Sequence, residues 1–344
     1  MTRNTPVPWL PAPIARVGES VYRAELARRS RRFDAGCGVV TIDRPVISVG
    51  NLSVGGTGKT PMVSLIVRWL LDAGLRPVIA MRGYAARAGL SDEAAEYGAR
   101  FGDDAPVVAQ PDRLEGLLRL FAGEAGRGVN VVVLDDGFQH RRIARAFDLV
   151  LIDASRDPFL DRCLPAGWLR EPVEALSRAS AVVLTHTELT SRGNLDLLGK
   201  RVASRTGRGP IAEAEHAWKG LLDAGGVERP VTWLRGKRVA VVCAIGHPDA
   251  FTRAVERATG VPPAHELVLR DHDPYRPTII DRIVTMASGC DAIVTTEKDW
   301  VKLARAPGNR WPCPVIRPTL ELRLARGGEA LRDRVLEAAA TAPA

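Results

Sequence analysis

SVGNLSVGGTGKTPMVSLIV, residues 48–67, runs from β-branched residues through a glycine-rich segment into an amphipathic pattern. We interpret this order as a strand, a tight loop and a helix. The glycines let backbone N–H groups approach an anion closely, and the helix directs the positive end of its dipole at the same point. The stretch therefore predicts a phosphate-binding loop.

The loop also carries side chains with predictable roles. Lys59 supplies a charge for terminal phosphates, and Thr60 offers a hydroxyl to Mg²⁺. The general pattern G-x-x-x-x-G-K-[ST] has glycine where this chain has Ser53, and a glycine turn that only links strand to helix is the alternative. Nucleotide contacts are expected from Ser53, Val54, Gly55, Gly56, Thr57, Gly58, Lys59 and Thr60.

Composition limits the classes of protein that fit. A chain of 344 residues, 46% hydrophobic and 26% charged, suggests a folded soluble protein of about two domains. We find no apolar run long enough to span a membrane and no export signal. Five scattered cysteines without a CxxC pair indicate reduced thiols in the cytoplasm. The net charge of +8 suits nucleic acid, an anionic membrane or a phosphorylated substrate.

From residue 45 the chain alternates apolar runs with helical patterns. Continuous apolar strands between helices predict a parallel sheet covered on both faces, with ligands at the carboxyl ends of the strands. The expected strands are PVISVGNL (45–52), RPVIAMRGY (76–84), APVVAQ (105–110), VNVVVLDD (129–136), DLVLIDA (148–154) and AVVLTHT (181–187).

A second, shorter series of the same kind follows, with strands expected in KRVAVVCAIG (237–246), HELVLRDH (265–272) and DAIVTTEKD (291–299). Extended segments at 211–221 and 313–324 bracket it as linker strands. We predict an α/β protein with a P-loop NTPase-like core over residues 1–210 and a smaller α/β domain over 216–316. A last helix, about residues 324–344, is expected to return to the first domain.

The N-terminal segment IARVGESVYRAELARRSRRF (14–33) can form a helix with an apolar edge and many arginines, preceded by Trp9 and Leu10. These are the features of a helix that lies on an anionic membrane. A helix that packs on its own domain and leaves its arginines in water is an equal alternative at this point.

Two acidic pairs could take part in chemistry. Asp135 and Asp136 end an apolar strand, where a P-loop protein holds Mg²⁺, although two turn aspartates are the alternative. Asp103 and Asp104 precede a strand and by themselves suggest a solvated turn.

Two further polar segments are candidates. His272 lies between two aspartates, which suits proton transfer, although a histidine in a polar loop is more often only exposed. Arg170 and Glu171 stand in LPAGWLREP (164–172), where an arginine could stabilise phosphoryl charge or the loop could be a structural turn.

Several motifs occur together in one order. They are VGNLSVGGTGKTP, RGY, DDGFQHRR, LPAGWLREP, GHP, DHDPY and TTEKDWVKL. In this set the chain closely resembles the tetraacyldisaccharide 4'-kinases, the lipid A 4'-kinases of Gram-negative bacteria. The resemblance spans about residues 8–324, and a serine or threonine commonly stands at the position of Ser53 in that family.

The resemblance implies an enzyme that transfers the γ-phosphoryl group of ATP to the 4'-hydroxyl of a tetraacyldisaccharide 1-phosphate, giving lipid IVA. It implies ATP and Mg²⁺ as cofactors, no nucleic acid, and a monotopic, peripheral position on the cytoplasmic face of the inner membrane. The N-terminal helix would then contact the anionic membrane surface.

The resemblance also implies residue roles. Asp103 matches the aspartate of a G-D-E-[PA] motif and His272 a histidine of a D-H-H-like motif, a pair thought to activate the sugar hydroxyl. Asp104 stands at the position of a metal-binding glutamate, and Asp135 and Asp136 match the acidic pair near the metal. Roles in catalysis are expected for Asp103, His272, Lys59 and Arg170, and in substrate binding for Gln139, His140, Arg141 and Glu171.

Two other functions remain as rivals. A P-loop switch ATPase would use the same loop to change conformation on a protein partner. It would need neither the Asp103–His272 pair nor a lipid-facing helix. Nucleic-acid binding is suggested only by charge, since no recognised module or aromatic-interleaved basic patch is present.

Overall fold

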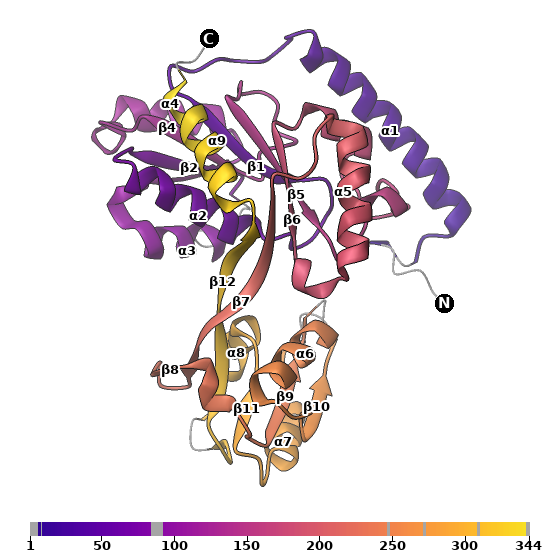
Figure 1. The fold of residues 1–344 in the computed structure, drawn as a ribbon, viewed down its shortest axis with the longest axis vertical. Coiled ribbons are helices and arrows are strands. Elements are labelled where there is room, and N and C mark those ends of the chain that lie inside the picture. The colour runs from indigo at the N-terminus through magenta and orange to yellow at the C-terminus, as the bar shows by residue number, and fades with distance from the viewer. Residues whose placement is uncertain are drawn as a thin grey trace. The chain divides into compact units, whose positions relative to one another are not determined.

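The computed structural model describes residues 6–7, 9–83, 92–245, 248–270, 273–307 and 310–341. The chain divides into two compact units, one made of residues 1–215 and 322–344 and the other of residues 216–321. Both units contain parallel strands with helices between them (Figure 1). The predicted α/β class is therefore confirmed.

The first unit is built on parallel strands in the order β7-β6-β5-β1-β4-β2-β3. The residues of β1, β2, β4 and β5 are buried along the whole of each strand, which explains their continuous apolar runs. The strand bounds are β1 Val46–Asn51, β2 Pro77–Met81, β3 Val107–Ala109, β4 Val131–Asp135, β5 Phe147–Asp153, β6 Ala181–Thr185 and β7 Ala212–Asp223.

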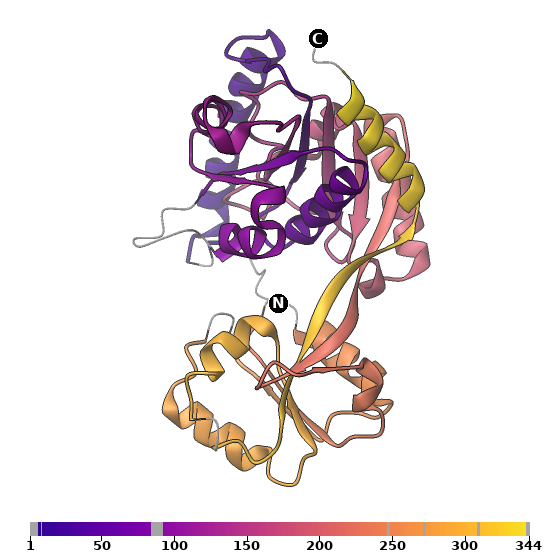
Figure 2. The ribbon, with the colours of Figure 1, turned by 90° about the vertical axis from the view of Figure 1, so that its left-hand side faces the viewer.

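Helices cover both faces of these strands (Figures 1 and 2). Val131 and Val133 of β4 pack in one cluster with α2, α3 and α9, whereas Val132 and Leu134 pack on the other face with α4. This alternation is the two-residue period of a strand. The helix bounds are α1 Ala12–Asp34, α2 Lys59–Asp72, α3 Asp92–Phe101, α4 Arg113–Ala122, α5 Arg192–Thr206 and α9 Gly328–Ala340.

The second unit has parallel strands in the order β10-β9-β11-β12. The chain enters this unit along β7 and leaves it along β12, after which α9 packs in the first unit through Leu331 and Val335. The bounds are β8 Glu228–Arg229, β9 Val239–Cys243, α6 Pro248–Thr259, β10 His265–Val268, α7 Pro277–Met286, β11 Ala292–Val294, α8 Glu297–Leu303 and β12 Val315–Arg326.

Short 3₁₀ helices complete the structure: η1 Gly102–Asp104, η2 Glu124–Gly126, η3 Pro158–Leu160, η4 Val173–Arg178, η5 Thr187–Leu189 and η6 Val231–Leu234. Among the described helices, none has both the length and the apolar character that crossing a bilayer requires. In the first unit, the carboxyl ends of β1 and β4 lead into the predicted glycine loop and the predicted acidic pair, which brings them to one edge of the sheet.

Candidate active site

The predicted phosphate-binding loop lies between β1 and α2, at the carboxyl edge of the first unit's sheet. Gly58 adopts the left-handed conformation (φ 79°) directly before the first helical turn, and Gly55 has a φ of 120°. Residues with a side chain rarely adopt either conformation, so both positions favour glycine. The loop and the helix N-terminus together form the kind of site that holds a phosphate.

Neighbouring segments brace this loop. The Asn51 amide donates to the Thr57 hydroxyl over 2.7 Å, and the Thr185 hydroxyl donates to the Thr57 carbonyl over 3.0 Å. The N–H of Val54 donates to the carbonyl of Trp168 over 2.8 Å. All eight residues predicted to contact the nucleotide lie in the loop or in the first turn of α2.

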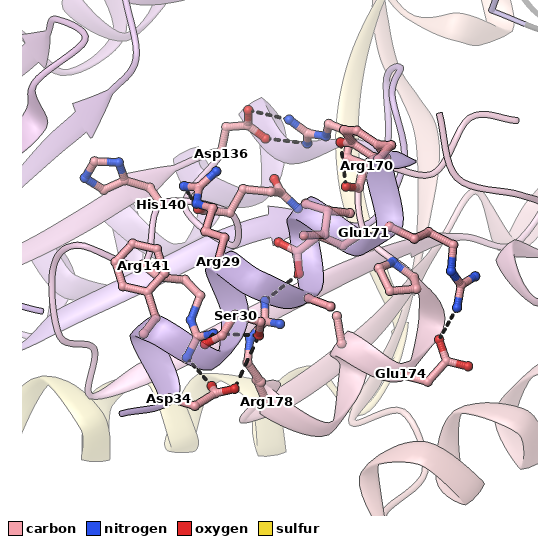
Figure 3. Close-up of a pocket in the computed structure, with 18 of the residues that line it drawn as sticks. Arg29, Ser30, Asp34, Asp136, His140, Arg141, Arg170, Glu171, Glu174 and Arg178 are labelled. Atoms are coloured by element: carbon pink, nitrogen blue, oxygen red, sulfur yellow. Dashed lines mark hydrogen bonds and ion pairs between the residues drawn. The ribbon is translucent and has the colours of Figure 1, made fainter. Parts of the chain in front are cut away.

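Asp136 connects the loop lysine to Arg170. The two terminal nitrogens of Arg170 donate to the two carboxylate oxygens of Asp136 over 2.7 and 2.6 Å (Figure 3), and Lys59 Nζ lies 3.6 Å from Asp136 Oδ1. Burial raises the pKa of Asp136, but hydrogen bonding to Arg170 and the charge of Lys59 outweigh it and hold that pKa at about 2. The carboxylate is therefore ionised at neutral pH.

Asp135, the last residue of β4, is buried and lies in a different environment. The Tyr97 hydroxyl donates to its Oδ2 atom over 3.0 Å. Its Oδ1 atom is buried and has no hydrogen-bond partner within the described part of the chain. Burial, with the nearby charge of Glu93, raises the pKa of Asp135 to about 6.

These donors fit a hard cation such as Mg²⁺. Asp135 Oδ1 is free to bind, whereas both oxygens of Asp136 accept from Arg170 and could reach a metal only through water. Thr60 stands in the first turn of α2 and lies near enough to the Tyr97 hydroxyl to lower the pKa of that tyrosine, although burial outweighs this effect. The described residues contain no cluster of three or more Asp, Glu, His or Cys side chains that could hold a metal alone. Mg²⁺ commonly takes one or two carboxylates and completes its shell with waters and substrate phosphates, so a partial set suffices.

Asp103 and Asp104 do not lie at this edge. They form part of η1, are exposed, and come directly before β3, which runs parallel to β2. Residues that precede a parallel strand lie at its amino end, whereas the loop of Lys59 follows the carboxyl end of β1. The ten residues of α3 separate the two edges by about 15 Å. This placement argues against the predicted roles of Asp103 in catalysis and Asp104 in metal binding.

The opposite end of α3 begins with two acidic residues that the sequence analysis did not select as candidates. The helix begins with Asp92 and Glu93. Burial is the main cause that raises the pKa of both Tyr97 and Asp135, and the charge of Glu93 adds to the rise. Glu93 therefore lies near the metal-type site. The signal was present in the sequence: S-D-E-A at 91–94 keeps the aspartate, glutamate and alanine of the motif G-D-E-[PA], whereas G-D-D-A at 102–105 keeps its glycine, aspartate and alanine but lacks the glutamate.

A cavity of about 940 Å³ opens beside this site, between α1 and the loops that follow β3, β4 and β5 (Figure 3). We call it the α1 cavity. Asp136 and Arg170 line it together with the predicted substrate residues. Its lining comprises Tyr22, Arg23, Leu26, Ala27, Arg29, Ser30, Phe33, Asp34, Arg82, Pro111, Arg113, Asp136, Gln139, His140, Arg141, Arg170, Glu171, Pro172, Glu174, Ala175, Ser177 and Arg178.

Several side chains of the α1 cavity have polar atoms that lack partners within the described residues, and Arg113 and His140 are two of them. Arg113 is buried at the start of α4; one terminal nitrogen donates to the Asp136 carbonyl over 3.2 Å, and its Nε has no partner. Burial, then the charges of Arg113 and Arg145, lowers the pKa of His140 to about 4, and its Nε2 is unpartnered. Sequence reasoning missed Arg113, because nothing in its local pattern shows that the guanidinium is buried.

The side chains of the other predicted substrate residues form hydrogen bonds with neighbouring residues. Gln139 donates from Nε2 to the Asn51 carbonyl over 2.8 Å. Arg141 donates to Asp34 of α1 over 2.6 Å, and Glu171 accepts from Arg178 over 2.7 Å. These side chains shape the wall of the α1 cavity.

The inner side of α1 is docked on the loop that carries Arg170. The Tyr22 hydroxyl donates to the Arg170 carbonyl over 2.9 Å, and the buried Glu19 accepts from the N–H of Cys163 over 3.1 Å. Its other side is exposed: Val17 and Val21 have 66% and 67% of their surface in solvent, and Ile14 and Trp9 are exposed as well. The helix therefore packs on its own domain and still presents an apolar stripe.

The structure thus brings Lys59, Thr60, Asp135, Asp136 and Arg170 to one edge, beside the α1 cavity with Gln139, His140, Arg141 and Glu171. His272, the predicted partner in proton transfer, lies outside the described residues.

Comparison with known proteins agrees with this site. The family model described as Tetraacyldisaccharide-1-P 4'-kinase (LpxK) matches residues 12–338. A tetraacyldisaccharide 4'-kinase of Anaeromyxobacter dehalogenans (strain 2CP-C) is 37% identical over 342 residues, which cover 92% of this chain and 87% of that relative. One from Syntrophotalea carbinolica is 33% identical over 342 residues, which cover 94% of this chain and 88% of that relative.

A solved structure gives the same answer. LpxK from Aquifex aeolicus, described as an "apo" form in complex with ATP, aligns with a TM-score of 0.65 at 27% identity and covers 93% of this chain and 96% of that one. The family match includes the glycine loop, the acidic pair and α1, so it extends over every part of the site described above. The chain belongs to the tetraacyldisaccharide 4'-kinase family.

Proposed function

We propose that the carboxyl edge of the first unit performs the 4'-kinase reaction of the family, transferring the γ-phosphoryl group of ATP to the 4'-hydroxyl of tetraacyldisaccharide 1-phosphate to give lipid IVA. One observation carries this proposal: Asp136 and Arg170, which adjoin the loop lysine, also line the α1 cavity. A phosphate site and an acceptor cavity therefore share two residues. Direct transfer requires such proximity, because the attacking oxygen must lie close to phosphorus.

The glycine loop is the proposed site of the ATP phosphates. Its backbone N–H groups and the α2 N-terminus face the phosphates, and Lys59 contacts the terminal ones. The described ATP complex of the Aquifex relative supports ATP as the donor. Arg170, fixed by Asp136 and Asn51, provides positive charge for the phosphoryl group in transit.

Thr60 and Asp135 are the residues that would hold Mg²⁺, and Glu93, whose charge raises the pKa of Asp135, is a further candidate ligand. When bound, this ion neutralises charge that develops on the phosphate oxygens. The protein's part is to keep Asp135 Oδ1 unpartnered and facing the site.

For the attacking hydroxyl we assign Asp92 in place of Asp103. In the segment S-D-E-A (91–94), Asp92 directly precedes Glu93 as the aspartate precedes the glutamate in the motif G-D-E-[PA], and an aspartate can orient a hydroxyl or accept its proton. The role of His272 stays a prediction from the family resemblance.

The α1 cavity is the proposed site of the disaccharide head. Its volume of about 940 Å³ is at the upper end of the usual range for small-molecule pockets. Arg113, a buried cation with an unpartnered Nε, suits a phosphate of the acceptor, and His140, neutral at pH 7 because its pKa is low, suits a sugar hydroxyl. Both ligand types match a phosphorylated sugar.

The exposed stripe of α1 is the proposed membrane contact. Trp9, Ile14, Val17 and Val21 would enter the interface of the bilayer, while the arginines of the helix meet anionic headgroups. This arrangement supports a peripheral position on the cytoplasmic face of the inner membrane, where the acyl chains of the acceptor remain in lipid.

The test is transfer of labelled γ-phosphate from ATP to tetraacyldisaccharide 1-phosphate in detergent micelles, with Lys59→Ala as the control. Label in the lipid that disappears in the control is the expected result. ATP hydrolysis without labelled lipid would instead favour the switch ATPase, and absence of both activities would reject a kinase.

A further inference from the structure

Tyr97 is one of the largest fully buried side chains of the protein, with 0% of its surface exposed. Its ring packs in the core between α2 and the strands, with Met62 and Ile66 in the same cluster. A phenylalanine would fill nearly the same volume without burying a hydroxyl, which costs free energy unless the hydroxyl is hydrogen-bonded. The position therefore raises the question of what the Tyr97 hydroxyl does.

The hydroxyl points at the residues that fit Mg²⁺. It donates to Asp135 Oδ2 over 3.0 Å, and Thr60 lies nearby. A tyrosine hydroxyl is protonated at neutral pH, so it remains a donor to Asp135.

The bond to Tyr97 makes the two oxygens of Asp135 different. Oδ2 accepts from Tyr97, whereas Oδ1 is buried and has no partner within the described residues. A free carboxylate could rotate and exchange its oxygens, but a hydrogen bond to one of them fixes the plane of the group. The unpartnered oxygen is then held in one direction, as neighbouring hydrogen bonds do for metal ligands in general.

Tyr97 also connects this carboxylate to α3. Glu93 lies four residues earlier, on the same face of the helix. Anchoring Tyr97 on the end of β4 therefore keeps the start of α3 near the metal-type site.

We propose that Tyr97 is a positioning residue for the metal ion: its hydroxyl fixes Asp135 so that Oδ1 faces the ion, and its anchorage holds the first turn of α3 beside that ion. This inference rests on the proposed Mg²⁺-dependent function. It assigns a role to a residue that does not itself touch the metal or the substrates.

The test is Tyr97→Phe, which keeps the ring and removes only the hydroxyl. Mn²⁺ binding is measured by electron paramagnetic resonance with the enzyme saturated with a non-hydrolysable ATP analogue. We expect the Kd for Mn²⁺ to rise about tenfold, the size of effect typical for residues that orient metal ligands. The affinity for the analogue without metal should change less than twofold.

Tyr275→Phe is the matched control, because Tyr275 is also a buried tyrosine but lies in the second unit. Tyr275→Phe also removes a buried hydroxyl, and it should leave the Kd for Mn²⁺ unchanged. Equal Kd values for wild type and Tyr97→Phe would overturn the proposal and leave Tyr97 as a core residue. A similar rise in both variants would also overturn it, since the effect would then follow general destabilisation.

A second measurement covers the case in which Tyr97→Phe does not fold. The protein has four tyrosines, Tyr22, Tyr84, Tyr97 and Tyr275, so fluorotyrosine labelling of a variant with phenylalanine at the other three reports Tyr97 alone. Its ¹⁹F resonance should shift when Mg²⁺ is added to the complex with the analogue, and an unchanged resonance would reject the proposal. Neither measurement uses the lipid, so failure of lipid phosphorylation would be recognised separately.

Discussion

Arg170 donates to both carboxylate oxygens of Asp136, over 2.6 and 2.7 Å, and a hydrogen bond to the Asn51 side chain extends from the same guanidinium. One side chain therefore joins the end of β4 to the end of β1, on either side of the phosphate loop. A planar guanidinium can make these bonds together, whereas an ammonium group cannot reproduce their fixed geometry. A substitution of Arg170 therefore tests the site directly.

Arg170→Lys should lower kcat about 100-fold, the usual loss when a positioned donor to a transition state is removed. The KM for ATP should change much less, because Lys59 and the loop backbone remain. Steady-state kinetics with labelled ATP checks this. Arg201→Lys is the matched control, since Arg201 also pairs with an aspartate, Asp157, but lies on α5 away from the phosphate loop. Equal losses in the two variants would contradict the role of Arg170.

We expect substitutions of the acidic residues at the two ends of α3 to have opposite effects on activity. Asp92→Asn should reduce lipid phosphorylation about 100-fold, as loss of a group that handles a proton does, and Glu93→Gln should raise the Mg²⁺ concentration needed for half-maximal rate. Asp103→Asn and Asp104→Asn should stay within about twofold of wild type, because both residues are exposed at the other edge of the sheet. Strong losses at 103 or 104 with normal activity at 92 and 93 would restore the original assignment.

The lowered pKa of His140 predicts how the free energy of unfolding depends on pH. Its pKa is about 4 in the folded protein, and about 6.5 is expected for an unfolded chain. Between these values the unfolded state binds a proton that the folded state does not, so the free energy of unfolding falls as pH falls. After allowance for partial solvent screening, the loss from pH 7.5 to 5 is about 1 kcal/mol.

Urea unfolding at pH 7.5 and at pH 5 measures this effect. Between pH 7.5 and pH 5, the free energy of unfolding of His140→Gln should decrease by about 1 kcal/mol less than that of wild type, because the variant has no group that titrates at this position. Identical decreases would show that His140 is protonated normally in the folded state.

The exposed stripe of α1 predicts a membrane-binding defect without loss of folding. The double variant Val17→Asp with Val21→Asp should bind vesicles that contain phosphatidylglycerol at least about tenfold more weakly, since two apolar side chains are replaced by anions. Co-sedimentation gives the affinity, and thermal melting should be unchanged because both positions are exposed. Val301→Asp, 60% exposed on α8, is the control and should bind as wild type does.

The parallel core could be predicted because its signals are local. Strands buried on both faces have continuous apolar runs, and the glycine loop has fixed spacing between β1 and α2. Asp135 could be placed near the loop for the same reason, because it ends a run that had to be a central strand. These inferences needed no knowledge of which strands are neighbours.

The remaining site residues depend on topology and burial. Asp103 matches the aspartate of the motif G-D-E-[PA] in sequence, yet its position before β3 puts it at the amino end of a strand. Arg113 resembles any arginine in a first helical turn, and only the packing around it shows that its charge is buried. The edge of the sheet and the degree of burial are properties of the assembled fold, which local patterns do not contain.

The bond between Tyr22 of α1 and the Arg170 carbonyl has a consequence for how the enzyme reaches its acceptor. Val21, the neighbour of Tyr22, lies on the stripe that we assign to the bilayer. Because one helix carries both residues, the depth at which the stripe would settle in the headgroup layer would set the height of the phosphate loop above the lipid. The sugar would then have to rise only to that height, and its acyl chains would not have to leave the leaflet.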